Sequence, residues 1–111
     1  MGELIYLDKR HANEPSRAER ALFAITERKA SITREMGRIR KIRIKAKAFR
    51  KTDNRRIEDV EKSFVTLLVW LRELGDEMNN SRHLRVLEKN YCDLANKFVR
   101  LRRKLAGRYL R

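Results

Sequence analysis

Apolar side chains recur every three or four residues through most of the chain, and this spacing divides it into three long amphipathic segments. Residues three and four apart lie on one face of an α-helix, so each segment is predicted to be a helix with one buried face. We expect helices at about 16–50, 54–75 and 81–106. The predicted fold class is all-α, an antiparallel coiled-coil-like bundle in one helical domain spanning 1–111, with residues 1–13 as an N-terminal arm.

The first predicted helix has a clear start and two chemically different faces. Pro15, Ser16 and Glu19 have the spacing of a capping box at a helix N-terminus. On a helical wheel the apolar residues fall within an arc of about 100°; they are Ala18, Ala21, Leu22, Ile25, Ile32, Met36 and Ile39. Arg34, Arg38, Lys41 and Lys45 lie opposite. The helix is therefore expected to bury its apolar face and to expose charged side chains on the opposite face.

The second and third predicted helices carry matching apolar seams. The second seam consists of Ile57, Val60, Phe64, Leu67, Leu71, Leu74 and Met78, and the third of Leu84, Leu87, Tyr91, Leu94, Phe98, Leu101 and Leu105. Both follow the alternating three- and four-residue steps of a coiled coil. Gly75 and the polar cluster Asn79, Asn80 and Ser81 are expected to end the second helix and cap the third, and a short turn between two matched seams predicts an antiparallel hairpin.

The junction of the first two helices is less well defined by the sequence. Thr52, Asp53 and Asn54 favour helix caps and turns, and Asp53 is the predicted N-cap of the second helix. Neither Gly nor Pro occurs between Arg34 and Asn54 except Gly37, which lies well inside the first helix. A single rod continuous through Thr52 to Asn54 therefore remains an alternative.

The middle of the second helix is apolar on more than one face. Between Phe64 and Leu71 only Thr66 is polar, which predicts a central helix with two neighbours or a partner subunit. We expect a homodimer. The first turns of the first helix are expected to extend past the other two, leaving further apolar side chains for a partner. The predicted oligomer or partner interface consists of Leu22, Phe23, Val65, Leu68, Val69 and Trp70.

The sequence lacks the signatures of several functional classes. No apolar run has the length of a signal peptide or a membrane span, so membrane association is not expected. Cys92 is the one cysteine, which favours a reducing, cytoplasmic location, nucleoid-associated if the partner is DNA. His11 and His83 have no Cys or carboxylate at metal-ligand spacing. We therefore expect no catalytic residues, no metal and no cofactor: the protein is predicted not to be an enzyme.

Positive charge is concentrated in two stretches of the chain. Eleven of the twenty-three residues from Arg34 to Arg56 are Lys or Arg, against two acids, and Lys97 to Arg111 holds seven basic residues and no acid. Together these stretches carry a charge of +16. The net charge of the whole chain is +14, so the remaining residues sum to about −2. A hairpin of the second and third helices would place the two stretches at one end of the bundle. Localised cationic charge is typical of nucleic-acid binding, because neutralised phosphates release counterions.

The sequence thus predicts a non-enzymatic protein that binds DNA or RNA through phosphates, with little sequence specificity. The predicted nucleic-acid-binding residues are Arg34, Arg38, Lys41, Lys45, Arg50, Arg55, Arg56, Arg100, Arg103, Lys104 and Arg108, with Phe49 and Tyr109 as candidates for base stacking. The alternative hypothesis is a helical adaptor or inhibitor that docks on an acidic surface of a partner, such as a nucleic-acid-processing enzyme. The sequence does not distinguish DNA from RNA or single from double strands.

Overall fold

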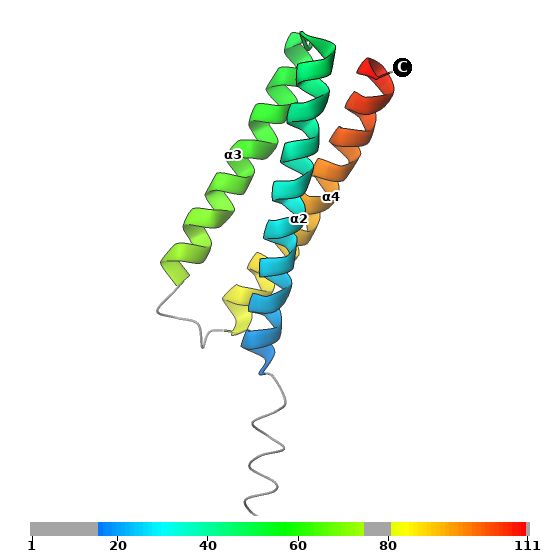
Figure 1. Ribbon diagram of the computed structural model, residues 1–111. Coiled ribbons are helices and arrows are strands. Elements are labelled where there is room, and N and C mark those ends of the chain that lie inside the picture. Colours follow the sequence, from blue (N-terminus) through cyan, green and yellow to red (C-terminus); the bar gives the residue numbers. More distant parts are fainter. Residues whose placement is uncertain (1–15, 75–80, 111) are drawn as a thin grey trace, which may run out of the picture.

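The computed structural model describes residues 16–74 and 81–110, and within these ranges it contains helices and no strand (Figure 1). The helices are α2 (Arg17–Ala46), α3 (Lys51–Glu73) and α4 (Ser81–Tyr109). They confirm the predicted all-α bundle. The predicted N-terminal arm, 1–13, lies outside the described residues.

The helices run up, down and up, so α3 is antiparallel to both α2 and α4, and α2 and α4 are parallel (Figure 1). Helix α4 packs against both of the others. The prediction that the second helix is central was therefore wrong. Its physical reason lies in α4, which has the apolar face wide enough to cover two neighbours, with Leu94 and Ala95 adjacent and both buried.

The core is built from the predicted seams. All seven seam residues of α4 are buried, and Tyr91, Phe98, Leu87 and Leu105 are fully enclosed. Phe64 of α3 lies edge-on to the rings of Tyr91 and Phe98, with ring centroids 6.4 and 6.5 Å away. This edge-to-face geometry is favourable for aromatic pairs. The aromatic cluster joins α3 to the middle of α4.

The start of α2 agrees with the sequence. Ser16 is the N-cap, in extended conformation, and its Oγ accepts a hydrogen bond of 3.1 Å from the backbone N–H of Glu19. This bond satisfies one of the N–H groups that a helix leaves without a partner at its first turn. Hence the predicted capping position is confirmed.

A turn at residues 47–50 separates α2 from α3, which excludes the continuous rod. Lys47 ends α2 with a φ of 64°, in the left-handed region, and Arg50 is the N-cap of α3. The predicted break at Thr52 to Asn54 was therefore placed too late, and Asp53 is not the N-cap. Asp53 is the third residue of α3, where a carboxylate also favours the positive end of the helix dipole.

The predicted overhang of α2 was also wrong. Ala21 and Ile25 near the start of α2 are buried, as are Leu84 and Leu87 near the start of α4. The two parallel helices have nearly equal lengths, 30 and 29 residues, or about 45 Å each at 1.5 Å per residue. Because they lie side by side along most of that length, α4 covers the first turns of α2.

The core predicts a contrast between two aromatic substitutions on α4. Phe98→Ala should lower the free energy of unfolding by about 3–5 kcal/mol, because it leaves a cavity at a fully buried site. Tyr91→Phe should not lower it, because the Tyr91 hydroxyl is buried without a hydrogen-bond partner among the described residues and its removal relieves a cost of about 1–3 kcal/mol. Burial raises the pKa of Tyr91 to about 12. Urea denaturation of both variants measures the difference.

Candidate functional site

The two basic stretches meet at the end of the bundle where α2 ends, α3 begins and α4 ends (Figure 1). Contacts between Asp53 and Arg50 on one side and Arg108 and Tyr109 on the other hold them together. This is the arrangement that the predicted hairpin requires. We use the name basic cap for the exposed Lys and Arg side chains at this end that form no ion pair with the described residues; they are Arg40, Lys41, Arg43, Lys45, Lys47, Arg50, Lys51, Arg55, Arg56, Arg100, Arg103 and Lys104.

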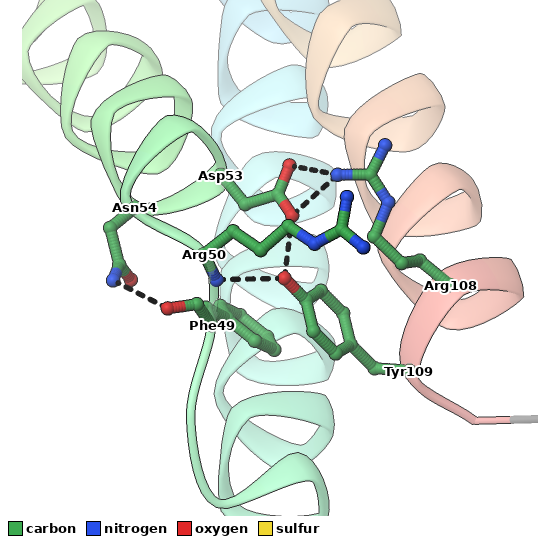
Figure 2. A network of polar contacts seen from close by, with 6 residues as sticks. All are labelled: Phe49, Arg50, Asp53, Asn54, Arg108 and Tyr109. Atoms are coloured by element: carbon green, nitrogen blue, oxygen red, sulfur yellow. Dashed lines mark hydrogen bonds and ion pairs between the residues drawn. The ribbon is translucent and has the colours of Figure 1, made fainter.

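Asp53 is the centre of the polar network at this end (Figure 2). Its side chain is 1% exposed. Arg108 Nη1 donates to both carboxylate oxygens, at 2.9 and 2.7 Å, and the Tyr109 hydroxyl donates to Oδ2 at 2.6 Å. The Tyr109 oxygen also accepts a 2.9 Å bond from the backbone N–H of Arg50. One buried carboxylate thus ties the last turn of α4 to the start of α3.

The ionised form of Asp53 is favoured by these contacts. Burial is the largest single influence on its pKa and opposes ionisation. The hydrogen bond from Tyr109, the hydrogen bond and charge of Arg108 and the charge of Arg56 together outweigh burial, so the pKa of Asp53 lies below its usual value of 3.8. The same contact with Asp53 raises the pKa of the Arg108 guanidinium.

Phe49 and Tyr109 stack on each other beside this network (Figure 2). Their ring centroids are 4.4 Å apart and the planes are inclined by 30°. Both rings are half-buried and pack against the core. One face of each ring is covered by the other ring, so the pair closes the end of the core. The base stacking predicted for these two residues stays a prediction.

A second buried carboxylate lies on the α2–α4 interface. Glu35 is 5% exposed. Its Oε2 accepts a 2.7 Å bond from Arg102 Nε on α4, and its Oε1 accepts a 2.9 Å bond from Arg38 Nη1 one turn along α2. Together, Asp53 and Glu35 pair with three guanidinium groups, and they are the two buried charged side chains of the described residues.

These pairs divide the predicted nucleic-acid-binding residues into two sets. Arg38 and Arg108 take part in internal ion pairs, so their charge is partly neutralised within the fold. The other nine are exposed, and none forms an ion pair with a carboxylate of the described residues; they are Arg34, Lys41, Lys45, Arg50, Arg55, Arg56, Arg100, Arg103 and Lys104. The structure brings eight of these to the basic cap, and Arg34 lies further along α2.

Sequence reasoning missed several residues of this site. Exposed basic side chains at the cap also include Arg40, Arg43, Lys47 and Lys51. The burial of the two carboxylates was missed too, although the signal was present. Glu35 is three residues after Ile32 and four before Ile39, and Asp53 is four before Ile57, so both continue an apolar stripe.

The predicted partner interface is partly taken up by the core. Leu68 and Trp70 are half-buried and pack against it, and Leu22 is half-buried as well. Phe23, Val65 and Val69 remain exposed, at 66%, 57% and 49%. The homodimer stays a prediction, with a smaller apolar surface than expected.

Outside the cap, the described residues provide neither a cluster of metal-binding side chains nor a helix suited to spanning a membrane. They contain no cluster of three or more His, Cys, Asp or Glu side chains suited to a metal ion. None of the described helices combines the length and apolar character needed to cross a bilayer. No protein-family model, curated protein or solved structure matches this chain. Its function is therefore inferred from the cap itself.

The Asp53 network predicts a pH-dependent difference between the native protein and Asp53→Asn. Because the pKa of Asp53 is lower in the folded state, its carboxylate stabilises the fold above about pH 3.8, and this stabilisation is lost as pH falls through the lowered value. The variant should therefore melt at a lower temperature at neutral pH, and the gap in melting temperature should shrink below pH 3.8.

Asp93→Asn is the matched control for this measurement. Asp93 is exposed on α4 and forms no ion pair with the described residues. It should melt close to the native protein at neutral pH. An equal loss in both variants would contradict the role of Asp53 as the carboxylate that joins α3 to α4.

Proposed function

We propose that this protein binds nucleic acids through their phosphate backbone, using the basic cap, and that it is not an enzyme. The observation that supports this most strongly is the set of exposed cations without carboxylate partners at one end of the bundle. Such charges repel one another and destabilise the compact fold. A polyanion relieves that repulsion and gains entropy from released counterions.

The internal ion pairs strengthen this interpretation. Acids are present at the cap, but Asp53 is buried and binds Arg108 and Tyr109, and the exposed Asp59 forms no ion pair with the described residues. The charge of Asp53 therefore serves the packing of α3 against α4 and leaves the outer cations unpaired. A surface that is only solvated would more often carry interleaved acids that pair with the cations. Arg is also nearly twice as frequent as Lys, 19 against 10, and its planar fork suits phosphate oxygens.

The geometry favours contacts to the backbone over reading of bases. The cap draws its cations from three helix ends and from the 47–50 turn, so they face several directions. Sequence-specific readers instead insert one short helix into the major groove with a few side chains at the base edges. Each described helix here is 23 residues or longer and packs within the bundle. We propose little base discrimination, with DNA and RNA both as candidate partners.

A homodimer and a cytoplasmic location are part of the same proposal. Exposed Phe23, Val65 and Val69 support a contact between copies, since large apolar side chains at the surface favour association. The lone Cys92 supports a reducing compartment.

Salt dependence tests the phosphate mechanism. If about six phosphates of duplex DNA are neutralised, the logarithm of the association constant should fall with the logarithm of salt concentration with a slope of about −5. Fluorescence anisotropy of a labelled duplex, titrated between about 50 and 300 mM KCl, measures this slope. Measurable binding with a slope near zero would exclude the mechanism.

A triple substitution tests the place of binding. Changing Arg55, Arg56 and Arg103 to Gln removes three cap cations and should reduce the magnitude of the salt slope by about 2–3, with equal weakening for unrelated sequences. The matched control changes Arg82, Arg85 and Lys89 to Gln, which removes the same charge from exposed positions near the other end of α4. If both triples weaken binding equally, net charge and not the cap drives it.

A further inference from the structure

A groove runs along the surface between α3 and α4, lined by residues from 56–67 of α3 and 90–104 of α4. It consists of two adjoining hollows that share Lys97. The hollow nearer the cap has a volume of about 300 Å³ and lies between Val60 of α3 and Leu101 of α4. The second, of about 400 Å³, lies about two turns further from the cap, and Leu67 and Leu94 line it together with the polar or charged residues Lys62, Ser63, Thr66, Asn90, Asp93 and Lys97.

The hollow nearer the cap combines an aliphatic floor with a cationic rim. Val60 and Leu101 belong to its lining, together with Arg56, Lys97, Arg100 and Lys104; Asp59 is the one acid there. None of these four cations forms an ion pair with a carboxylate of the described residues. A ligand that fits must therefore offer both apolar side chains and negative charge.

The dimensions of the groove fit an α-helix. Along α4 the two hollows extend from Asn90 to Lys104, which is about 21 Å at 1.5 Å per residue, or about four helical turns. Grooves between antiparallel helices are a common binding surface for an amphipathic helix, whose apolar residues at three- and four-residue spacing enter successive hollows. The hollow nearer the cap matches one such anchor position, and the more polar second hollow lies about two turns further along α4.

The chemistry of the groove favours a protein segment over a nucleic acid. No aromatic side chain lines either hollow, so unpaired bases have no ring on which to stack. Asp59 and Asp93 lie on the rim, where phosphates at fixed spacing would approach them. A peptide can place Glu beside the cations and leave small residues beside these two acids. The aliphatic floor of the hollow nearer the cap also matches a Leu, Ile or Val anchor.

We propose that this groove docks an acidic amphipathic helix from a partner protein. Its apolar face lies on Val60 and Leu101, and its carboxylates pair with Lys97 and Arg100. Arg56, Arg100 and Lys104 belong both to this rim and to the cap, so the partner helix and a nucleic acid compete for the same cations. The docking itself does not depend on the proposed nucleic-acid function.

The probe is a synthetic helix of ~18 residues with Leu at three- and four-residue spacing and Glu and Ala elsewhere. Its affinity for the full chain is measured by fluorescence anisotropy, against a peptide of the same composition whose Leu residues are spread over all faces. The amphipathic peptide should bind about tenfold more tightly. Equal affinity of the two peptides would overturn the proposal, because charge alone would then account for binding.

Two pairs of variants locate the binding. Val60→Ser should weaken the amphipathic peptide about five- to tenfold, whereas Val65→Ser, the same change at an exposed position of α3 outside the groove, should not. Lys97→Glu should also weaken it, and Lys89→Glu on the outer face of α4 should have a much smaller effect. Circular dichroism establishes that each variant is folded. If Val60→Ser is not folded, the comparison of Lys97→Glu with Lys89→Glu decides the outcome, because both of these side chains are exposed.

A labelled duplex separates this proposal from the nucleic-acid function. Val60→Ser should leave duplex affinity unchanged, because its side chain carries no charge. If peptide affinity falls equally in the groove variants and in their controls, the proposal that the groove docks a helix is rejected, whether or not the duplex binds. Peptide binding that follows these expectations while no duplex binds leaves the groove standing and rejects the nucleic-acid function.

Discussion

The fold depends on the burial of two carboxylates beneath a dense set of cations. Asp53 and Glu35 are almost inaccessible, and each lies at a contact between helices: Asp53 between α3 and α4, Glu35 between α2 and α4. Without them, the basic end of each helix would meet the basic ends of its neighbours with no compensating charge. Removing one partner of such a buried pair is costly, because the other is left without its hydrogen bonds. Each acid therefore stabilises the packed helices as long as its arginine partners are present.

Helix α4 is the element on which this compensation converges. It carries Arg102, which binds Glu35, and Arg108, which binds Asp53, and it also supplies the core side chains that face both neighbours. Its apolar and ionic contacts thus act at the same two interfaces. Since the ion pairs use cations that point toward α2 and α3, the basic side chains on its remaining faces stay exposed to solvent. Helix α4 therefore directs its apolar and paired side chains toward α2 and α3 and its unpaired basic side chains toward solvent.

The sequence predicted the apolar framework well and the turn between α2 and α3 poorly. Periodicity identified each seam residue of α4, because a helix that packs on two neighbours must repeat its apolar residues without a break. The break before α3 has no Gly or Pro signal, and contacts from far along the chain hold it: the ring of Tyr109 covers Phe49, and its hydroxyl accepts the Arg50 N–H. Local propensity at Thr52 to Asn54 was overridden by these contacts. Likewise, the helical wheel gave the face of Arg38 but not the carboxylate that pairs with it.

The cap and the groove favour ligands of different shape and chemistry, although the two surfaces share three cations. At the cap, charge faces several directions around the helix ends, and an extended polyanion satisfies it without a matching shape. In the groove, cations line one side of an aliphatic floor between Val60 and Leu101, so negative charge alone leaves the apolar surface uncovered. A ligand gains from both only if its own charges and apolar groups lie on one face with helical spacing. Arg56, Arg100 and Lys104 belong to both surfaces, so under the two proposals occupation of one surface would reduce the positive potential at the other, and the two ligands would be coupled through electrostatics without a change of conformation.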